Sequence, residues 1–290
     1  MKRNYQILLL VLLISISFAT STYAASQISF VSDVTEITAP AESGLFYPGK
    51  VKIEGTSKLE KIWLCVRGPA GEVTYYPINV TNNTFQYQLS LRFGPGTYTI
   101  WVGNDSQNFD GSIRFEVINS LNEDLRYSEP SAYIDSDNQI VTSLSNSLIN
   151  PKMTDEEKLK AIYGWVTRNI SYDYKAYQEQ KNELKPASLI IQEKKGMCCD
   201  YSFVVAALAR AAGLEARVVF GQASDSKNSP KIYHAWNEVK IDGSWVSLDA
   251  TWDAGYIRAG KFISAPQQKY FNPDTKVFNQ THQAEKITLD

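Results

Sequence analysis

A cysteine, a histidine and an aspartate in the second half of the chain are the residues best suited to chemistry. Cys198 precedes an alanine-rich run, His234 begins an alternating segment, and Asp249 ends a second alternating segment. A thiol beside an imidazole that a carboxylate orients is an activated nucleophile. These three residue types therefore indicate a thiol enzyme, provided that the fold brings them together.

The segment from Asp200 to Ala212 predicts a helix that begins near Cys198 and ends at Gly213. It contains helix-forming residues with no proline or glycine, and a glycine is the usual residue after a helix C-terminus. A thiol in the first turn lies against unpaired N–H groups and the positive end of the helix dipole, which lowers a thiol pKa. The same N–H groups can stabilise an oxyanion on an attacked carbonyl.

The Asp-Gly pair at 242–243 lies between the two alternating segments and predicts a two-residue hairpin turn. In the register that this turn sets, His234 lies opposite Thr251 and Trp236 lies opposite Asp249. Because strand side chains alternate between faces, His234 and Asp249 share a face as diagonal neighbours, about 7–8 Å apart. A histidine ring can span that separation, so the hairpin alone places an imidazole beside a carboxylate.

Cys199 is the alternative nucleophile. Successive helical residues point about 100° apart, so only one of the two thiols can face His234, and the Gly-x-Cys-x-Asp spacing selects Cys198. His282 is the other histidine of the chain and lies in a polar segment, where we expect it to be structural or exposed. We expect Asp200 to cap the helix or to form an ion pair.

The same segments resemble the transglutaminase-like superfamily, in particular its secreted bacterial members. The resemblance covers the chain from about residue 150 onward and rests on motifs that begin at Gly196, Leu208, His234 and Trp245 and occur in that order. It implies a papain-like α+β core. It also implies that Cys198 is the nucleophile, His234 the general base and acid, and Asp249 the orienting carboxylate.

The first residues predict a secretory signal peptide over 1–24. Two basic residues precede an apolar run from Ile7 to Ala19, and small residues follow up to a cleavage site after Ala24. No later segment is long and apolar enough to span a bilayer. We therefore expect a secreted or cell-surface protein with no transmembrane segment in the mature chain.

Residues 27–119 predict an all-β domain, 120–152 a linker, and 153–290 the transglutaminase-like catalytic domain. Turn residues separate short strands at regular spacing, which indicates an immunoglobulin-like β-sandwich that serves as a spacer or binding module. The six expected strands are Lys50–Glu54, Lys61–Arg67, Val73–Val80, Phe85–Leu91, Thr97–Gly103 and Ser112–Ile118.

Helices are expected in the rest of the chain at Ile140–Ile149, after a capping box that begins at Thr154, and at Ala187–Lys194. A strand is expected at Leu214–Gly221. For the oxyanion hole, Tyr172 or Trp165 are the side chains considered.

Charge and metal-ligand content exclude several classes of function. The formal net charge is −2, which gives no basic footprint for nucleic acid. Two histidines far apart in the sequence, without a Cys-x-x-Cys pair, offer no ordinary zinc site. Animal transglutaminases use calcium, but no acidic loop of that kind is present. We therefore expect no metal or cofactor, and at least one free thiol among the three cysteines.

The expected reaction is thiol acyl transfer on amide bonds of protein or peptide substrates, with cell-wall-associated substrates as one candidate class. A thioester forms on Cys198, and an amine or water resolves it. Two alternatives remain open: a secreted cysteine peptidase or amidase acting on protein or peptidoglycan, and a non-catalytic surface scaffold or adhesion protein. New N-termini without cross-links favour the peptidase, whereas an unchanged phenotype in Cys198→Ala favours the scaffold.

Overall fold

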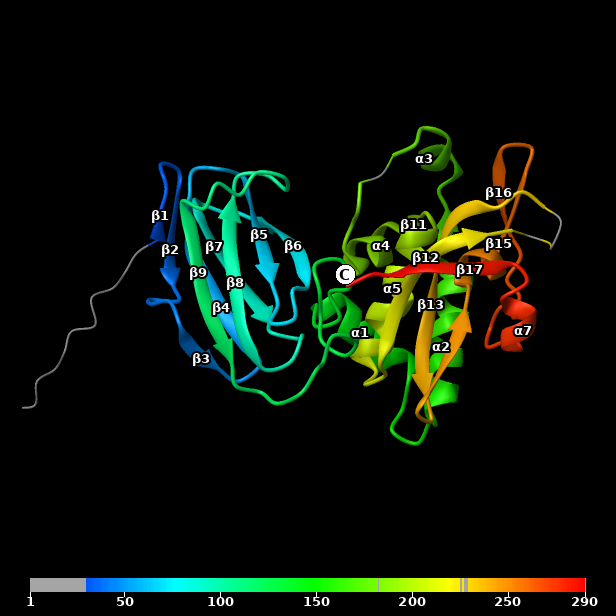
Figure 1. Ribbon diagram of the computed structural model, residues 1–290. Helices are drawn as coiled ribbons and strands as arrows, with labels where there is room; N and C mark the ends of the chain where they lie inside the picture. Colours follow the sequence, from blue (N-terminus) through cyan, green and yellow to red (C-terminus); the bar gives the residue numbers. More distant parts are fainter. Residues whose placement is uncertain (1–29, 182, 225, 227–228, 290) are drawn as a thin grey trace, which may run out of the picture.

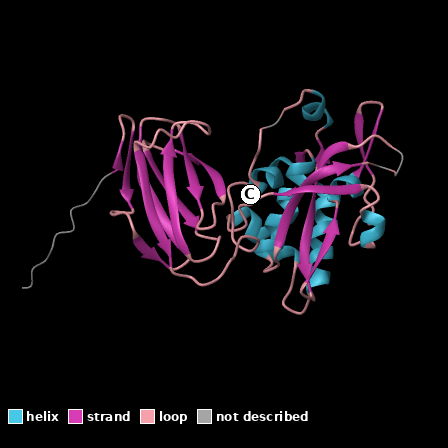
Figure 2. Cartoon of the chain, in the orientation of Figure 1, coloured by secondary structure: helices cyan, strands magenta, loops and turns pink. Residues whose placement is uncertain are grey.

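The computed structural model describes residues 30–181, 183–224, 226 and 229–289. The described chain forms an all-β N-terminal region and a mixed α/β C-terminal region (Figures 1 and 2). The predicted signal peptide lies outside the described residues. Among the residues that are described, no helix is both long and apolar enough to cross a membrane.

The N-terminal region consists of two sheets with strand orders β1-β2-β4-β7 and β3-β9-β8-β5-β6. Alternate side chains of the longer strands point into one apolar cluster between the sheets, including Ile53, Leu64, Ile100 and Phe115. The strands are β1 Phe30–Val31, β2 Thr35–Ala39, β3 Leu45–Tyr47, β4 Lys50–Ser57, β5 Lys61–Arg67, β6 Val73–Asn79, β7 Thr84–Ser90, β8 Gly96–Gly103 and β9 Ile113–Asn119.

All six predicted strands of this region are present, with shifts of a few residues at their ends. Strands β1 to β3 were not predicted, because they contain 2, 5 and 3 residues and carry little periodicity. The Tyr98 hydroxyl accepts the N–H of Phe93 at 2.7 Å and donates to the carbonyl of Gly94 at 2.9 Å, as in a tyrosine corner. The immunoglobulin-like identity and the domain boundaries stay predictions.

In the C-terminal region, helix α5 lies at the centre, between a four-stranded sheet of order β14-β13-β12-β17 and the helices α1, α2 and α4 (Figure 1). The helices are α1 Gln139–Leu148, α2 Asp155–Asn169, α3 Tyr174–Gln178, α4 Ala187–Glu193, α5 Cys198–Ala211, α6 Ala250–Ala254 and α7 Thr275–Phe278. The strands are β10 Ser171–Tyr172, β11 Lys195–Gly196, β12 Ala216–Ala223, β13 Ile232–Ile241, β14 Ser244–Leu248, β15 Gly255–Arg258, β16 Lys261–Ser264 and β17 His282–Ile287.

The predicted capping box at the start of α2 is present. The Thr154 hydroxyl accepts the N–H of Glu157 at 3.2 Å, and the Glu157 carboxylate accepts the N–H of Thr154 at 2.8 Å. The apolar stripe of this helix faces α5 and includes Leu159, Ile162 and Val166, all fully buried. The helix thus provides one wall of the core on which α5 rests.

The hairpin register is confirmed as far as Leu248. Asp242 and Gly243 both have positive φ, as a type I′ turn requires, and Ile241 pairs with Ser244. The predicted second strand is wrong beyond Leu248, because pairing stops there and the chain turns into α6. The expected cross-strand pairs beyond that residue therefore do not form.

Strand β17 was not predicted, and it connects the two regions. It lies antiparallel to β12, at the edge of the sheet. Beyond its end, Leu289 packs against the apolar cluster of the N-terminal region, and its carbonyl accepts a hydrogen bond from the buried guanidinium of Arg92. The described C-terminal residues accordingly lie between the two regions in Figure 1.

Candidate active site

Cys198 is the first residue of helix α5. The Asp200 carboxylate folds back and accepts the N–H of Met197 at 2.7 Å, which confirms its predicted capping role. This turn requires a glycine at position 196, since a Cβ there would lie 2.4 Å from the Cβ of Asp200. The first-turn N–H groups have no carbonyl partner within the helix, so they surround the thiol with positive partial charge.

The two neighbouring thiols have different surroundings. Cys198 and Cys199 both border a cavity of about 260 Å³, and both are free thiols. Burial, followed by the nearby charge of Asp200, raises the pKa of Cys199 far above its usual value and keeps it protonated. Cys198 lies close enough to His234 to contribute to the raised pKa of that imidazole, and both residues border the smaller cavity. The geometry therefore favours Cys198 as the nucleophile.

His234 lies on β13 between the thiol and Asp249. Its Nε2 lies 2.7 Å from Oδ2 of Asp249, a short distance typical of a charge-assisted hydrogen bond. Since Nε2 is engaged there, Nδ1 is the nitrogen left for the Cys198 thiol. Burial lowers the pKa of His234, but the charge and hydrogen bond of Asp249, together with the contact to Cys198, outweigh burial and raise the pKa to about 10.

Asp249 is fully buried and is the N-cap of α6. Its Oδ1 accepts the N–H groups of Thr251 at 2.9 Å and Trp252 at 3.2 Å, which leaves Oδ2 for His234. Burial alone would raise the pKa of the Asp249 carboxyl, but the charge of His234 and the hydrogen bonds hold it well below its usual range. The residue predicted on a strand thus reaches the same imidazole from a helix cap.

The expectation for His282 is only partly right. His282 is structural in the sense that it is buried, but it is not exposed, and its Nε2 lies 3.2 Å from the same Oδ2 of Asp249. Its ring stacks on Phe278 with 3.8 Å between ring centroids. The polar residues next to His282 gave no signal of this burial, because Trp236 and Trp252, which help to cover the ring, come from distant segments.

His234, Asp249 and His282 form one group of side chains that is geometrically able to hold a metal ion, since their ligand atoms lie within 4.8 Å of one another. The two histidines are far apart in sequence but close in space, with ring centroids 6.1 Å apart. Nε2 of His234 and Nε2 of His282 lie 2.7 and 3.2 Å from the same oxygen of Asp249. These hydrogen bonds satisfy both imidazoles and the carboxylate without an ion.

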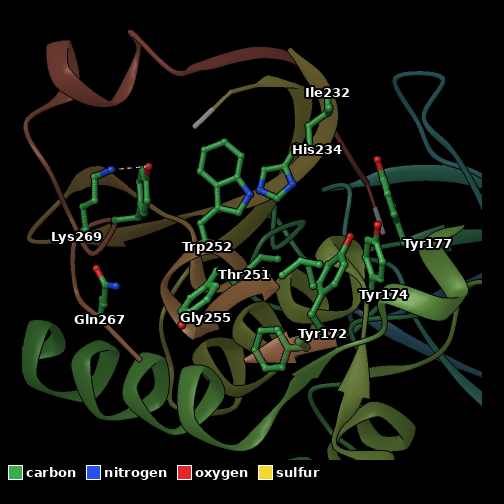
Figure 3. A pocket seen from close by; sticks show the side chains of 14 residues that line it. Tyr172, Tyr174, Tyr177, Ile232, His234, Thr251, Trp252, Gly255, Gln267 and Lys269 are labelled. Atoms are coloured by element: carbon green, nitrogen blue, oxygen red, sulfur yellow. Dashed lines mark hydrogen bonds between the residues drawn. The ribbon is translucent and has the colours of Figure 1, made fainter. Parts of the chain in front are cut away.

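An aromatic cleft opens beside His234. It consists of a cavity of about 470 Å³ and the smaller cavity at the thiols, and Tyr172, Tyr177, Ile232 and His234 border both. Figure 3 shows the His234 ring beside the indole of Trp252, with Tyr172, Tyr174 and Tyr177 on the other side of the imidazole. The rings of His234 and Trp252 are stacked, with centroids 4.9 Å apart.

Of the two side chains considered for the oxyanion hole, only Tyr172 lies at the site. It belongs to β10, whose pairing with Gly196 of β11 places it next to the start of α5. Burial and the nearby Cys198 raise the pKa of Tyr172, so its phenol is neutral and able to donate. Trp165 packs against the hydrophobic core and is not among the residues that line the two cavities of the cleft.

Residues 142–250 match the family model of the transglutaminase-like superfamily. This part of the chain belongs to that superfamily. The transglutaminase-like segment contains Cys198, His234 and Asp249, whereas His282 lies beyond its end. The match and its mixed α/β fold support an enzyme of a thiol-dependent family.

Two mammalian relatives match about half of the chain. Kyphoscoliosis peptidase of Homo sapiens is 29% identical over 147 residues, which cover 48% of this chain and 22% of the relative. Kyphoscoliosis peptidase of Mus musculus is 27% identical over 150 residues, which cover 49% of this chain and 23% of the relative. The chain thus spans less than a quarter of the length of these relatives.

Similar solved structures include a candidate cysteine protease from Cytophaga hutchinsonii, with 18% identity, TM-score 0.39 and coverage of 76% of this chain and 78% of that one. Red sea bream transglutaminase has 12% identity, TM-score 0.31 and coverage of 76% and 50%.

Proposed function

We propose that this protein is a thiol acyl-transfer enzyme acting on amide bonds of protein or peptide substrates. The Cys198 thiolate attacks the amide carbonyl, the C–N bond breaks, and His234 gives its proton to the leaving amine. A thioester remains on Cys198. An amine or water then loses a proton to His234 and attacks the thioester, which releases the thiolate and the product.

The observation that carries this proposal is the position of the His234 ring. Its Nε2 lies 2.7 Å from the Asp249 carboxylate, and the ring borders the same cavity as the Cys198 thiol, at the N-terminus of α5. An imidazolium stabilised by a buried carboxylate supports a neighbouring thiolate, which is the reactive form of cysteine. The first-turn N–H groups of α5 and the Tyr172 phenol are the donors available to the oxyanion.

The aromatic cleft supports a peptide rather than a small polar substrate. Several of the rings and apolar side chains that border it are substantially exposed, including Tyr177, Ile232 and Tyr256 at 48, 44 and 49%. Exposed apolar side chains gathered around a reactive group are typical of a binding site. An apolar segment of a protein next to the reacting amide fits these walls.

Hydrolysis is the second candidate outcome, because the matching mammalian relatives carry the name peptidase. The nucleophile and its partners are the same for both outcomes, and the acceptor decides between them. We also propose that the protein acts outside the cytoplasm after removal of residues 1–24, with the N-terminal β region as an immunoglobulin-like spacer or binding domain. A non-catalytic scaffold is the remaining alternative.

Alkylation of the purified protein with iodoacetamide tests the nucleophile. We expect Cys198 to be modified at pH 6–7, well below the usual thiol pKa of about 8.5, with the site located by mass spectrometry. His234→Ala should slow the modification strongly, and Cys198→Ala should abolish it. Reaction of Cys198 no faster than that of an unfolded control would refute the proposal and favour the scaffold.

The acceptor is then assigned with a glutamine-containing protein and a fluorescent primary amine. Amine incorporation that disappears in Cys198→Ala identifies transfer. New N-termini without incorporation identify peptide hydrolysis by the same thiol.

A further inference from the structure

His282 is buried at the site without contacting the thiol. It is the first residue of β17 and pairs with Ala223 of β12. A glycine at position 221 lets β17 approach, since a Cβ there would lie 2.1 Å from the carbonyl oxygen of Gln283. The side chain of His282 is 0% exposed. It is surrounded by the aromatic rings of Phe278, Trp236, Trp252 and Tyr270.

Two imidazoles share one oxygen of Asp249. Nε2 of His234 and Nε2 of His282 lie 2.7 and 3.2 Å from Oδ2, while the other carboxylate oxygen is occupied by two backbone N–H groups. We propose that His282 is a positioning residue of this site, which fixes the Asp249 carboxylate through a neutral imidazole protonated at Nε2. This inference rests on the proposed role of Cys198 and His234.

The neighbours of the second ring nitrogen agree with this proton position. Nδ1 of His282 lies 2.9 Å from the hydroxyl of Thr281, which can donate to it. The same hydroxyl lies 3.1 Å from the carbonyl of Phe278, to which it can also donate, so the proton position is decided by the Asp249 carboxylate, which can only accept from Nε2. Each donor and acceptor around the ring therefore has a partner when Nε2 carries the proton.

Charge balance also favours a neutral His282. The titratable groups around the ring are Asp249, His234 and the phenol of Tyr270, so a single carboxylate would have to balance two imidazolium ions in an aromatic enclosure. The bond from His282 is 3.2 Å long, whereas the bond from His234 is 2.7 Å and has the length of a charge-assisted one. One imidazolium, on His234, matches one carboxylate.

The consequence for the reaction is orientation. Four N–H donors fix the orientation of the Asp249 carboxylate, and its Oδ2 holds Nε2 of His234, which leaves Nδ1 for Cys198. Without the donor from His282, the carboxylate oxygen that binds His234 is free to shift within the site. The thiol–imidazole contact would then be populated for a smaller fraction of the time.

The proton position is measured by ¹⁵N NMR of protein labelled at histidine. The chain contains two histidines, so the ring signals are assigned by substituting one of them. We expect the His282 Nε2 to be protonated and its Nδ1 to be unprotonated at neutral pH. This reading is independent of any activity, so it tests His282 even if Cys198 proves not to be a nucleophile.

Two substitutions separate positioning from packing. His282→Phe keeps an aromatic ring on Phe278 but removes the donor, and we expect the alkylation rate of Cys198 at pH 6.5 to fall about tenfold, as for loss of one hydrogen bond to a charged group. His282→Gln places an amide N–H near the same oxygen and should restore most of the rate. Gln283→Ala, the exposed next residue on β17, is the control for strand integrity.

Three results would overturn the proposal. The first is a His282 that carries its proton on Nδ1. The second is a folded His282→Phe protein whose Cys198 is alkylated at the wild-type rate. The third is stoichiometric zinc that is present after chelator-free purification and lost in His282→Phe. In the third case the ring nitrogens would be metal ligands. If His282→Phe does not fold, the NMR reading of the wild type and the His282→Gln rate still decide. Failure of wild-type Cys198 to react would instead refute the proposed function.

Discussion

Replacing Asp249 by asparagine tests the whole arrangement around His234. The asparagine carbonyl can still accept the N–H groups of Thr251 and Trp252, so its NH₂ group points at His234 in place of Oδ2. To pair with an NH₂ donor, Nε2 of His234 must lose its proton. The ring would then carry its proton on Nδ1, facing Cys198, and would be unable to accept the thiol proton there.

The size of the effect follows from the pKa of His234. Its rise from 6.5 to about 10 corresponds to about 5 kcal/mol in favour of the imidazolium, at about 1.4 kcal/mol per unit. Among the causes that raise this pKa, Asp249 is the largest and Cys198 is smaller. A loss of about 4 kcal/mol corresponds to a rate about 10³-fold lower, and we expect that reduction in the alkylation of Cys198 at pH 7.

The assay compares second-order iodoacetamide rates of wild type and Asp249→Asn, with far-UV circular dichroism and thermal melts as a check of folding. Asp249→Ala is the second variant, because it removes the carboxylate without adding a donor. A folded Asp249→Asn protein whose Cys198 reacts within about tenfold of wild type would show that the carboxylate does not control the imidazole, and the reasoning would fail.

Three further outcomes are expected. Cys199→Ala should leave the alkylation of Cys198 at the wild-type rate, because burial keeps the Cys199 thiol protonated. Peptide mapping by mass spectrometry checks this, and a large fall in the alkylation rate would contradict it. Tyr98→Phe should lower the free energy of unfolding of the N-terminal region by about 1–3 kcal/mol, because the substitution leaves the N–H of Phe93 unpaired. Urea unfolding measures this loss, and the alkylation rate of Cys198 should not change. The His234–Asp249 pair should stabilise the fold most between about pH 4 and 6.5. The folded pKa of Asp249 is depressed, so its contribution is lost as pH falls below about 4, and that of His234 is raised, so its contribution is lost as pH rises from about 6.5 through 10. Urea unfolding across pH should show both losses, and Asp249→Asn should flatten them.

The short-range features of the site could be predicted from the sequence. The helix that begins at Cys198 is fixed by composition and by the glycine after its end, and the Asp-Gly turn sets a register that holds from Ile241 and Ser244 to Leu248. Both signals act within a few residues. The pairing of His234 with Asp249 was expected as a diagonal strand contact, and it occurs by another route.

The strand ended earlier than expected because Asp249 is a helix cap. Its side chain accepts two backbone N–H groups of the following turn, and this local bond competes with strand pairing. Alternation of apolar residues up to Leu248 gave no warning of the change. An aspartate followed by Ala-Thr-Trp-Asp is compatible with either structure in isolation.

His282 could not be found in the same way. The residues directly beside it in sequence are polar, and Trp236 and Trp252, which help to bury it, are brought there only by the tertiary fold. The same holds for β17, whose burial pattern is mostly exposed apart from His282. A single partner strand, β12, stabilises it, and sequence periodicity does not report on that contact.

Strand β17 also determines where the chain can be cut. A fragment that ends at residue 250, where the family match ends, would keep Cys198, His234 and Asp249 in its sequence. It would nevertheless leave the N–H and carbonyl groups of β12 unpaired along Val219–Ala223, an open edge that invites pairing between molecules. Such a fragment should aggregate, and loss of its activity would then say nothing about the three residues it retains.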